Sequence, residues 1–373
     1  MNLSKLTEAH ESSMPWLKDS IILATRAGSH AYGTNIEGSD EDYRGVAIAP
    51  REYYLGFVKT FEQAEQHEPY DSVIYELRKF MRLAADCNPS ILELLFVDQS
   101  DVIYETPAGW LLRLNAQAFL SKKAQYTFTG YAISQLGRIK RHYAWLKNPP
   151  KAAPKRSDYG LPESTLVPAD QRMAAEAAIH KKIQEWIPDL EPLDSATRIL
   201  ITDRIQKAMV GMKLATEEDT WRAAARDIGV SDSFIHLLGM ERAYNGAQNE
   251  WKQYQNWKAT RNPARAALEE RYGYDTKHGM HLVRLMRMGY EILLTGKVLV
   301  KRPDAEELLS IRAGAWSYEQ LIDFATGMEK SIEVAAGLSS LPRAPDREAL
   351  DRLCVSLAEQ MHDDSTHRRG GQR

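Results

Sequence analysis

The stretch RAGSHAYGTNIEGSDEDYRGV, residues 26–46, decides how the first part of the chain folds. A short apolar and β-branched run, IILATR at 21–26, precedes it and ends at Gly28, as a buried strand that enters a loop does. The loop returns through Ser39 into DYRGVAIA, 42–49, which we predict to be a second strand. The pattern indicates two strands joined by a glycine-rich loop; taken alone, it also fits a polar surface turn.

Two acids, Asp40 and Asp42, stand at the entrance of the second predicted strand. Because side chains alternate between the two faces of a strand, both carboxylates are expected to point into the same space. Like charges this close repel strongly unless a cation lies between them. Carboxylate oxygens favour Mg²⁺, which commonly keeps waters and takes further ligands from substrate phosphates. The pair therefore predicts a Mg²⁺ site, with Mn²⁺ as the alternative metal.

Gly28 and Ser29 precede this acidic pair and carry the groups that bind phosphate. Glycine lets a ligand approach the backbone closely, and a serine offers both a hydroxyl and an amide N–H. If a helix begins at this point, its free N–H groups attract phosphate. A phosphate site beside a metal site predicts that the chain binds a nucleoside triphosphate (NTP) with its metal.

A third strand is predicted for DSVIYEL, residues 71–77, and it continues into the helical pattern of RKFMRLAADCN. The apolar stripe of that helix closes before Asn88-Pro89, so strands and helix make a compact α/β unit. After about residue 110, helical periodicity takes over, apart from KVLVKRP at 297–303, which we predict to be a strand or an extended hairpin arm. Helices are expected at roughly 170–187, 194–216, 217–228, 232–272, 277–295 and 317–337.

The loop has the fuller form Gly-Ser-x-x-Tyr-Gly-Thr, followed by Ser39-Asp40-Glu41-Asp42 and then Arg44-Gly45-Val46. This resembles the nucleotidyltransferase superfamily typified by DNA polymerase beta, in which a Gly-Ser motif precedes a strand-borne Asp-x-Asp. The segments YELRKFMRLAADCNPSILELLFV and LEERYGYDTKHGMHLVRLMRMGYEILLTGKVLVKRPDAEELLSIRAG resemble its RNA-repair-pathway, RNA-ligase-associated branch. No Walker A loop or dinucleotide fingerprint competes with this interpretation.

The resemblance implies that an NMP passes from an NTP, with ATP the expected nucleotide, to an acceptor hydroxyl, and that pyrophosphate is released. It implies three catalytic, metal-binding carboxylates, and Asp71 is preferred as the third over Glu76, which stands where a helix should begin. Arg44 either steadies a phosphate or pairs with the acids. The implied acceptor is an RNA end; a small molecule, a protein side chain and a non-catalytic NTP-binding role are the alternatives.

The expected fold class is α+β, with a small mixed-sheet polymerase beta-like nucleotidyltransferase domain followed by a mainly α-helical domain. The predicted divisions are a nucleotidyltransferase α/β core at 1–115, a helical extension at 116–147, a proline-rich loop at 148–168, a helical region at 169–340 that closes on substrate or nucleotide, and a C-terminal helix with a polar tail at 341–373. The tail, DDSTHRRGGQR, is expected to be disordered.

The predicted helix at 277–295 places Lys277, His281 and Arg284 at i, i+4 and i+7, where they form one cationic stripe. Lys277 and His278 follow the turn GYDTKH directly, and we predict that they contact the nucleotide phosphates. A solvated basic face is one alternative. A zinc site through His278 and His281 is another, but no acid or cysteine accompanies them on this helix.

The composition of the chain excludes several classes of protein. Of the 373 residues, 43% are apolar, enough for a sizeable core, and the net charge of −3 gives no global attraction to nucleic acid or anionic membrane. Cys87 and Cys354 are too few for a disulfide framework, which suits a reducing compartment. The first twenty residues lack the order of a signal peptide, and no apolar run could span a membrane, so a cytoplasmic protein is expected.

Two segments mix basic and aromatic residues in a way that suits binding of single-stranded RNA: RIKRHYAWLKNPPKAAPKR and YNGAQNEWKQYQNWKATRNPAR. Tyr244, Trp251 and Tyr254 recur at helical spacing, however, which favours packing. MHDDSTH, 361–367, superficially resembles a metal-dependent phosphohydrolase motif, but it adjoins the polar tail.

Overall fold

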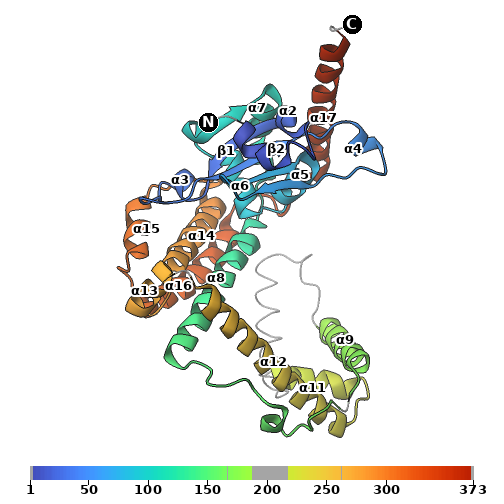
Figure 1. Cartoon of the computed structure of the whole chain (residues 1–373), viewed down its shortest axis with the longest axis vertical. Coiled ribbons are helices and arrows are strands. Elements are labelled where there is room, and N and C mark those ends of the chain that lie inside the picture. The colour runs from blue at the N-terminus through green and yellow to red at the C-terminus, as the bar shows by residue number, and fades with distance from the viewer. Residues whose placement is uncertain (1–2, 166, 187–216, 262, 371–373) are drawn as a thin grey trace. The chain divides into compact units, whose positions relative to one another are not determined.

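The computed structural model describes residues 3–165, 167–186, 217–261 and 263–370, which form two compact units (Figure 1). Unit 1 combines Met1–Tyr143 with Ala264–Arg373, and unit 2 is Ala144–Pro263. The small mixed sheet followed by mostly helical structure confirms the predicted α+β class. The predicted helix at 194–216 lies outside the described residues.

Unit 1 contains a five-stranded sheet with the order β3-β4-β2-β1-β5. The parallel pair β2 and β4 sets Asp42 opposite Asp71 and Ala47 opposite Glu76, whereas the other neighbouring strands are antiparallel. The three strands predicted from apolar alternation correspond to β1, β2 and β4. The bounds are β1 Ile21–Ala27, β2 Asp42–Ala47, β3 Gln63–Gln66, β4 Asp71–Glu76 and β5 Val102–Glu105.

Alternation along β2 buries both faces of the sheet. Tyr43 and Ala47 pack with Leu6 and Leu17 of the N-terminal helices, while Val46 belongs to the larger core on the opposite face.

The helices of unit 1 are α1 Ser4–Thr7, α2 Leu17–Ser20, α3 Gly28–Tyr32, α4 Glu52–Leu55, α5 Leu77–Ala85, α6 Pro89–Phe96, α7 Pro107–Leu114, α8 Ala124–Lys147, α13 Pro263–Tyr272, α14 Thr276–Thr295, α15 Ala305–Arg312, α16 Tyr318–Leu338 and α17 Arg347–Gly370.

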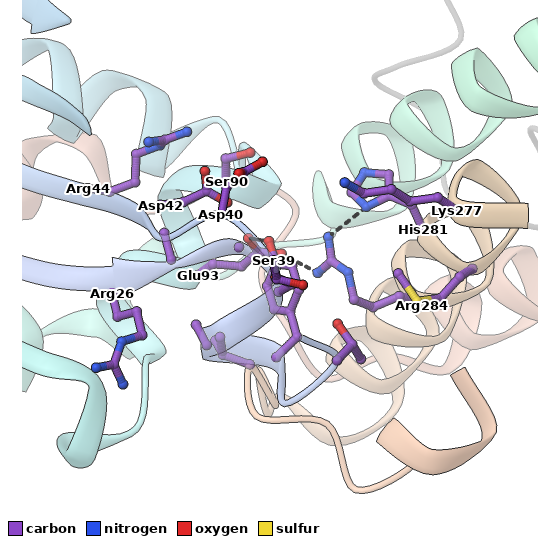
Figure 2. A pocket seen from close by; sticks show the side chains of 18 of the residues that line it. Arg26, Ser39, Asp40, Asp42, Arg44, Ser90, Glu93, Lys277, His281 and Arg284 are labelled. Atoms are coloured by element: carbon purple, nitrogen blue, oxygen red, sulfur yellow. Dashed lines mark hydrogen bonds and ion pairs between the residues drawn. The ribbon is translucent and has the colours of Figure 1, made fainter. Parts of the chain in front are cut away.

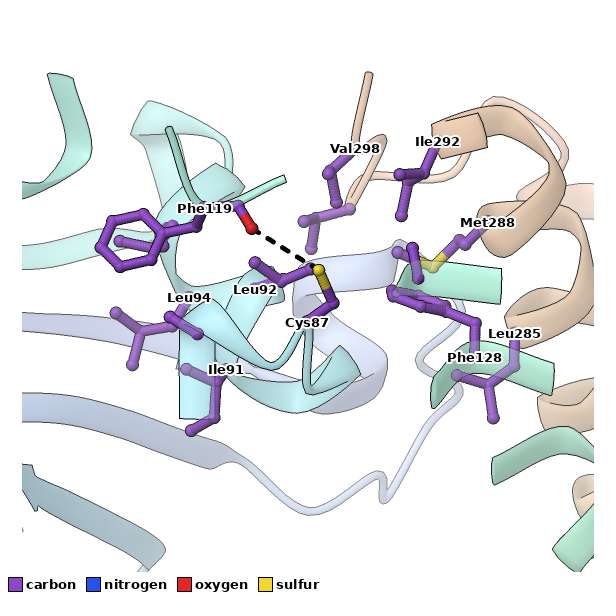
Figure 3. Packing of buried hydrophobic residues seen from close by; sticks show 14 of the residues in the cluster. Cys87, Ile91, Leu92, Leu94, Phe119, Phe128, Leu285, Met288, Ile292 and Val298 are labelled. Atoms are coloured by element: carbon purple, nitrogen blue, oxygen red, sulfur yellow. Dashed lines mark hydrogen bonds between the residues drawn. The ribbon is translucent and has the colours of Figure 1, made fainter. Parts of the chain in front are cut away.

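The larger core joins segments that are far apart in the sequence. Figure 3 shows Leu92 and Cys87 close to Phe128 of α8 and to Leu285 and Met288 of α14. All five side chains are almost completely buried. Because α14 buries most of its circumference, it behaves as a core helix of unit 1 and positions whatever polar side chains it carries.

Unit 2 is built from α9 Ala169–Trp186, α11 Glu217–Asp227 and α12 Asp232–Thr260 around a small apolar cluster. Arg156 of the proline-rich segment donates to both carboxylate oxygens of the buried Glu241 on α12. Three of the aromatic residues in the segments suspected of binding RNA pack with one another, since Trp145 is buried against Tyr254 and Trp257.

The structure corrects three sequence predictions. Of the two alternatives predicted for residues 297–303, the strand is not formed: no strand among the described residues pairs with them, and the Arg302 N–H donates instead to the Tyr32 carbonyl of α3 at 3.0 Å. The helix predicted at 232–272 is divided into α12 and α13, the second starting at Pro263. The tail continues α17 to Gly370 because an established helix gains one hydrogen bond for each residue it adds.

Candidate active site

The turn between β1 and α3 brings the glycine of the opening stretch against the second acid. Gly28 has φ +63°, in the left-handed region, and a Cβ built on it would lie 2.0 Å from Asp42 Oδ2. α3 begins at Gly28, as the phosphate hypothesis required, and Ser29 lies in its first turn. Glycine is needed here for the turn and also for the close approach of the Asp42 carboxylate.

Asp40 and Asp42 both line a cavity of about 380 Å³ in unit 1, within the size range of small-molecule sites. Only Asp42 lies in the strand: β2 begins there because its partner β1 turns into α3 after Ala27. Burial raises the pKa of Asp42, and the neighbouring charges of Asp71 and Asp40 raise it further, against the opposing effect of Arg44 and Lys277. A bound cation would relieve this crowding of carboxylates.

Asp71 lies on the strand next to Asp42, where the parallel register pairs the two residues. Its carboxylate is 3.9 Å from the Arg44 guanidinium and 3.7 Å from His67 Nδ1, and it does not line the cavity. Glu76 is five residues further along β4, where it is buried and caps α5 by accepting from the Lys79 N–H at 3.0 Å. The geometry therefore separates the two candidates: only Asp71 is at the acidic end of the sheet.

The donor set fits a hard cation that is held in part by its substrate. Among the residues that the structure describes, no cluster of three or more His, Cys, Asp or Glu side chains forms a complete metal site. Asp40 and Asp42 supply carboxylate oxygens only, and Mg²⁺ commonly takes one or two carboxylates together with water and substrate phosphates. Asp275 lies 3.0 Å from His278 Nδ1, but His278, His281 and this acid are not part of any group of three among the described residues that could hold a zinc ion.

Helix α14 supplies much of the wall across from the acids, as Figure 2 shows for Lys277, His281 and Arg284. Burial lowers the pKa of Lys277, as do Arg265 and Arg312, while Asp40 and Asp275 oppose the shift. In the described part of the chain, no carboxylate lies within 4.0 Å of the Lys277 ammonium. Its charge is thus directed at the cavity, where an anionic ligand would stabilise it.

His278 is anchored by the residue that begins the helix. Asp275 accepts the His278 backbone N–H at 3.1 Å, and its carboxylate is 3.0 Å from His278 Nδ1. Burial raises the pKa of Asp275, but the hydrogen bonds and charge of His278, with Arg265, outweigh it and lower the value to about 2. The His278 side chain lines the cavity beside this ion pair.

The structure corrects the predicted cationic stripe at His281. Burial lowers the pKa of His281 to about 3, assisted by the charge of Arg284, so the ring is neutral. Arg284 is fully buried and ion-paired with Glu93 on α6, and its guanidinium lies over the Tyr32 ring, 3.7 Å from the centroid. The stripe is therefore neither uniformly cationic nor a solvated basic face.

Several cavity residues escaped the sequence reasoning. Glu93 is the one charged residue within the apolar run ILELLF, which is a signal that could have identified it. Arg265 lies in the second basic and aromatic segment and Arg312 in the C-terminal segment of the resemblance, but only the fold shows that α13 and α15 bring them to the cavity. The basic side chains lining the cavity are Arg26, Arg44, Arg265, Lys277, Arg284 and Arg312, against three carboxylates, Asp40, Asp42 and Glu93. This excess of positive charge suits a polyphosphate.

The N-terminal part of the chain, which carries the acidic pair, is similar to a known family. Residues 1–148 match the model of the RNA repair pathway DNA polymerase beta family, which confirms the predicted polymerase beta-like nucleotidyltransferase branch for this part of the chain.

Two curated relatives have similar sequences. The uncharacterized protein YcgL of Bacillus subtilis (strain 168) is 32% identical over 117 residues, which are 30% of this chain and 44% of that protein. The chain thus matches less than half the length of this relative. The uncharacterized 38.9 kDa protein of the nrdC-mobD intergenic region of Enterobacteria phage T4 is 22% identical over 84% of this chain and 89% of its own length. No solved structure matches the chain.

Across the described helices, none combines the length and the apolar composition that crossing a membrane requires.

Proposed function

We propose that the chain is a metal-dependent nucleotidyltransferase that transfers an NMP from an NTP to an acceptor hydroxyl and releases pyrophosphate. The observation that carries this proposal is the close approach of Gly28 and Asp42, because it brings the turn at the start of α3 against one of the two acids. The cations of α14 on the other side of the same cavity support it, because a triphosphate bridges two such walls.

In this proposal Asp40 and Asp42 hold Mg²⁺, or Mn²⁺ in its place, and Asp71 assists from the neighbouring strand. The metal, when bound, would neutralise phosphate charge and polarise the α-phosphate. Ser29 and Lys277 bind the outer phosphates from opposite walls, which orients the α-phosphorus towards the acids.

The reaction itself breaks a phosphoanhydride bond and forms a phosphoester bond. The acceptor oxygen forms a bond to the α-phosphorus while the bond from that phosphorus to the β-phosphate oxygen breaks, so pyrophosphate leaves. Asp71 is exposed enough, at 41% of its side chain, to take the acceptor's hydroxyl proton. Arg44, which lines the cavity and lies 3.9 Å from Asp71, would stabilise the charge on the leaving phosphates together with His278.

We propose ATP as the nucleotide and an RNA end as the acceptor; the description of the family that matches residues 1–148 supports the second choice. Small molecules and protein side chains are the competing acceptors, since the same core chemistry serves any hydroxyl. A non-catalytic NTP-binding role is the alternative from another class.

The test incubates the protein with each α-labelled NTP, Mg²⁺ or Mn²⁺, and separate RNA, small-molecule and protein acceptors. The proposal expects label on one acceptor, dependent on the metal, and at least a hundredfold less with Asp40→Ala/Asp42→Ala. Glu329→Ala/Glu333→Ala, which removes two exposed carboxylates from α16, is the matched control and should keep full activity. Transfer that survives in the double aspartate variant contradicts the proposal that Asp40 and Asp42 hold the metal. Binding of NTP without any transfer contradicts the proposal that the chain is an enzyme.

A further inference from the structure

His281 occupies the cavity wall between Lys277 and Arg284, one helical turn from each. The proposed chemistry has not used it, although its ring lines the same cavity as the acidic pair. Its role depends on which ring nitrogen carries a proton, and its neighbours decide this.

Arg284 fixes one of the two ring nitrogens. Its guanidinium is 3.2 Å from His281 Nδ1, and a guanidinium can only donate hydrogen bonds. Nδ1 must therefore accept, which leaves it without a proton. In a neutral imidazole, the proton is then on Nε2.

Arg284 itself cannot turn away from the histidine. It donates to Glu93 Oε1 at 2.5 Å, and Glu93 Oε2 accepts a further hydrogen bond from the Tyr32 hydroxyl at 2.6 Å. The Tyr32 ring covers the guanidinium, and Met288 Sδ is 3.1 Å from it on the same helix. With only 1% of Arg284 exposed, its charge and orientation are fixed by partners on three elements, α3, α6 and α14.

The second ring nitrogen of His281 is available to a ligand. Within the described part of the chain, no group accepts a hydrogen bond from Nε2. Burial lowers the pKa of His281, and the charges of Arg284, His278 and Lys277 lower it further, so the ring is uncharged at neutral pH. The cavity is already rich in cations, so a neutral donor adds a directional hydrogen bond there without adding further like charge.

We infer that His281 is an uncharged hydrogen-bond donor, through Nε2–H, to a phosphate oxygen of the NTP, an assignment that rests on the proposed nucleotide site. We favour phosphate over the base because this part of the wall lies near the proposed metal site: the charge of Asp40 acts on Lys277, one turn earlier on the same helix. Arg284, Glu93 and Tyr32 are positioning residues in this arrangement, since they act on the ligand only through the ring.

The first test reads the tautomer in the ligand-free protein. Long-range ¹H–¹⁵N correlation spectra of histidine-labelled protein at pH 7 should show His281 with an unprotonated Nδ1 and a protonated Nε2. The signals are assigned by their disappearance in His281→Gln. A proton on Nδ1, or protons on both nitrogens, overturns the inference.

The second test measures binding by calorimetry, with Mg²⁺ and an ATP analogue that has a methylene group between the α- and β-phosphorus atoms. His281→Leu should bind about tenfold more weakly, as expected for a lost hydrogen bond to a charged group. His281→Gln places an amide N–H near the Nε2 position and should stay within about threefold of the wild type, whereas the shorter His281→Asn should resemble the leucine variant. Equal affinity of His281→Leu and the wild type overturns the inference, and so does a glutamine variant as weak as the leucine one.

Tripolyphosphate and adenosine separate the two ends of the nucleotide. The leucine variant should lose affinity for tripolyphosphate to the same extent as for the ATP analogue and should leave adenosine binding unchanged. Loss confined to adenosine overturns the assignment to phosphate. Neither experiment measures transfer, so a protein that binds NTP through His281 but labels no acceptor would contradict the proposed reaction and leave this inference intact.

Discussion

Gly28 and Asp42 lie close together in space although thirteen residues separate them in the sequence. A methyl group on Gly28 would overlap Asp42 Oδ2, and φ +63° is costly for any residue with a Cβ. We predict that Gly28→Ala displaces the Asp42 carboxylate and weakens binding of Mg²⁺ with NTP by at least tenfold. Calorimetric titration, together with the melting temperature, measures both effects.

Gly33→Ala is the matched control for this prediction. Gly33 has φ +73°, so an alanine there would be destabilised by a similar backbone strain of about 1 kcal/mol. Its Cβ, however, would meet only Ala305, at 3.9 Å. This variant should lose stability and keep nucleotide affinity. Equal affinities of the two alanine variants would show that the Asp42 contact is not needed for binding.

At the scale of single residues, the sequence predicted positions better than charge states. Gly28, Ser29, Asp40 and Asp42 meet at one cavity, as the spacing of the motif suggested. His281 was expected to be cationic, because helical periodicity places it on a basic stripe but does not reveal that Arg284 is buried beside it. A charge state depends on burial and on partners from distant segments, which no local pattern contains.

At the scale of the element, the N-terminus of α14 depends on one carboxylate. Asp275 is buried and has its pKa lowered to about 2, so its ionised form stabilises the folded state. Asp275→Asn keeps the hydrogen-bond acceptor of the cap but removes the charge. We predict a loss of about 2 kcal/mol in the free energy of unfolding at pH 7.

The sign of the pH dependence follows from the lowered pKa. The contribution of Asp275 is complete above its unfolded value of about 3.9 and disappears as the pH falls through about 2 in the folded state. The difference between wild type and Asp275→Asn should therefore shrink between pH 4 and pH 2 in urea unfolding. Asp346→Asn, at the exposed cap of α17, should change stability by less than about 0.5 kcal/mol throughout. A constant difference across this range would contradict the prediction.

The elements that the sequence missed are short or lack an apolar pattern. β3 has only four residues, QAEQ, and is a strand because β4 offers it a pairing edge. KVLVKRP has the alternating apolar residues of a strand, yet Val298 and Val300 are buried outside the sheet. Strand formation depends on an available partner strand. A segment can therefore form a strand without an apolar pattern, or have such a pattern and form no strand.

At the scale of the whole molecule, the family match and the cavity cover different parts of the chain. Residues 1–148 carry the acids, but Lys277, Arg284 and the other cations of α13, α14 and α15 come from the second segment of unit 1. No local signal shows that a chain leaves a unit and returns to it after 120 residues of another unit. The C-terminal resemblance suggested that these helices contribute, but only the fold shows which residues face the acids.

This division predicts different fates for two shortened chains. A fragment of residues 1–148 should aggregate, because it exposes the apolar surface, including Phe128, against which Leu285 and Met288 pack. A chain that joins Tyr143 to Ala264 through a flexible Gly/Ser linker of about 12 residues retains both segments of unit 1. We expect it to fold and to bind the methylene ATP analogue with Mg²⁺ within about threefold of the full chain. Dye binding to exposed apolar surface, circular dichroism and calorimetry distinguish the two. A soluble fragment 1–148 with full nucleotide affinity would show that the cations of α14 do not belong to the site.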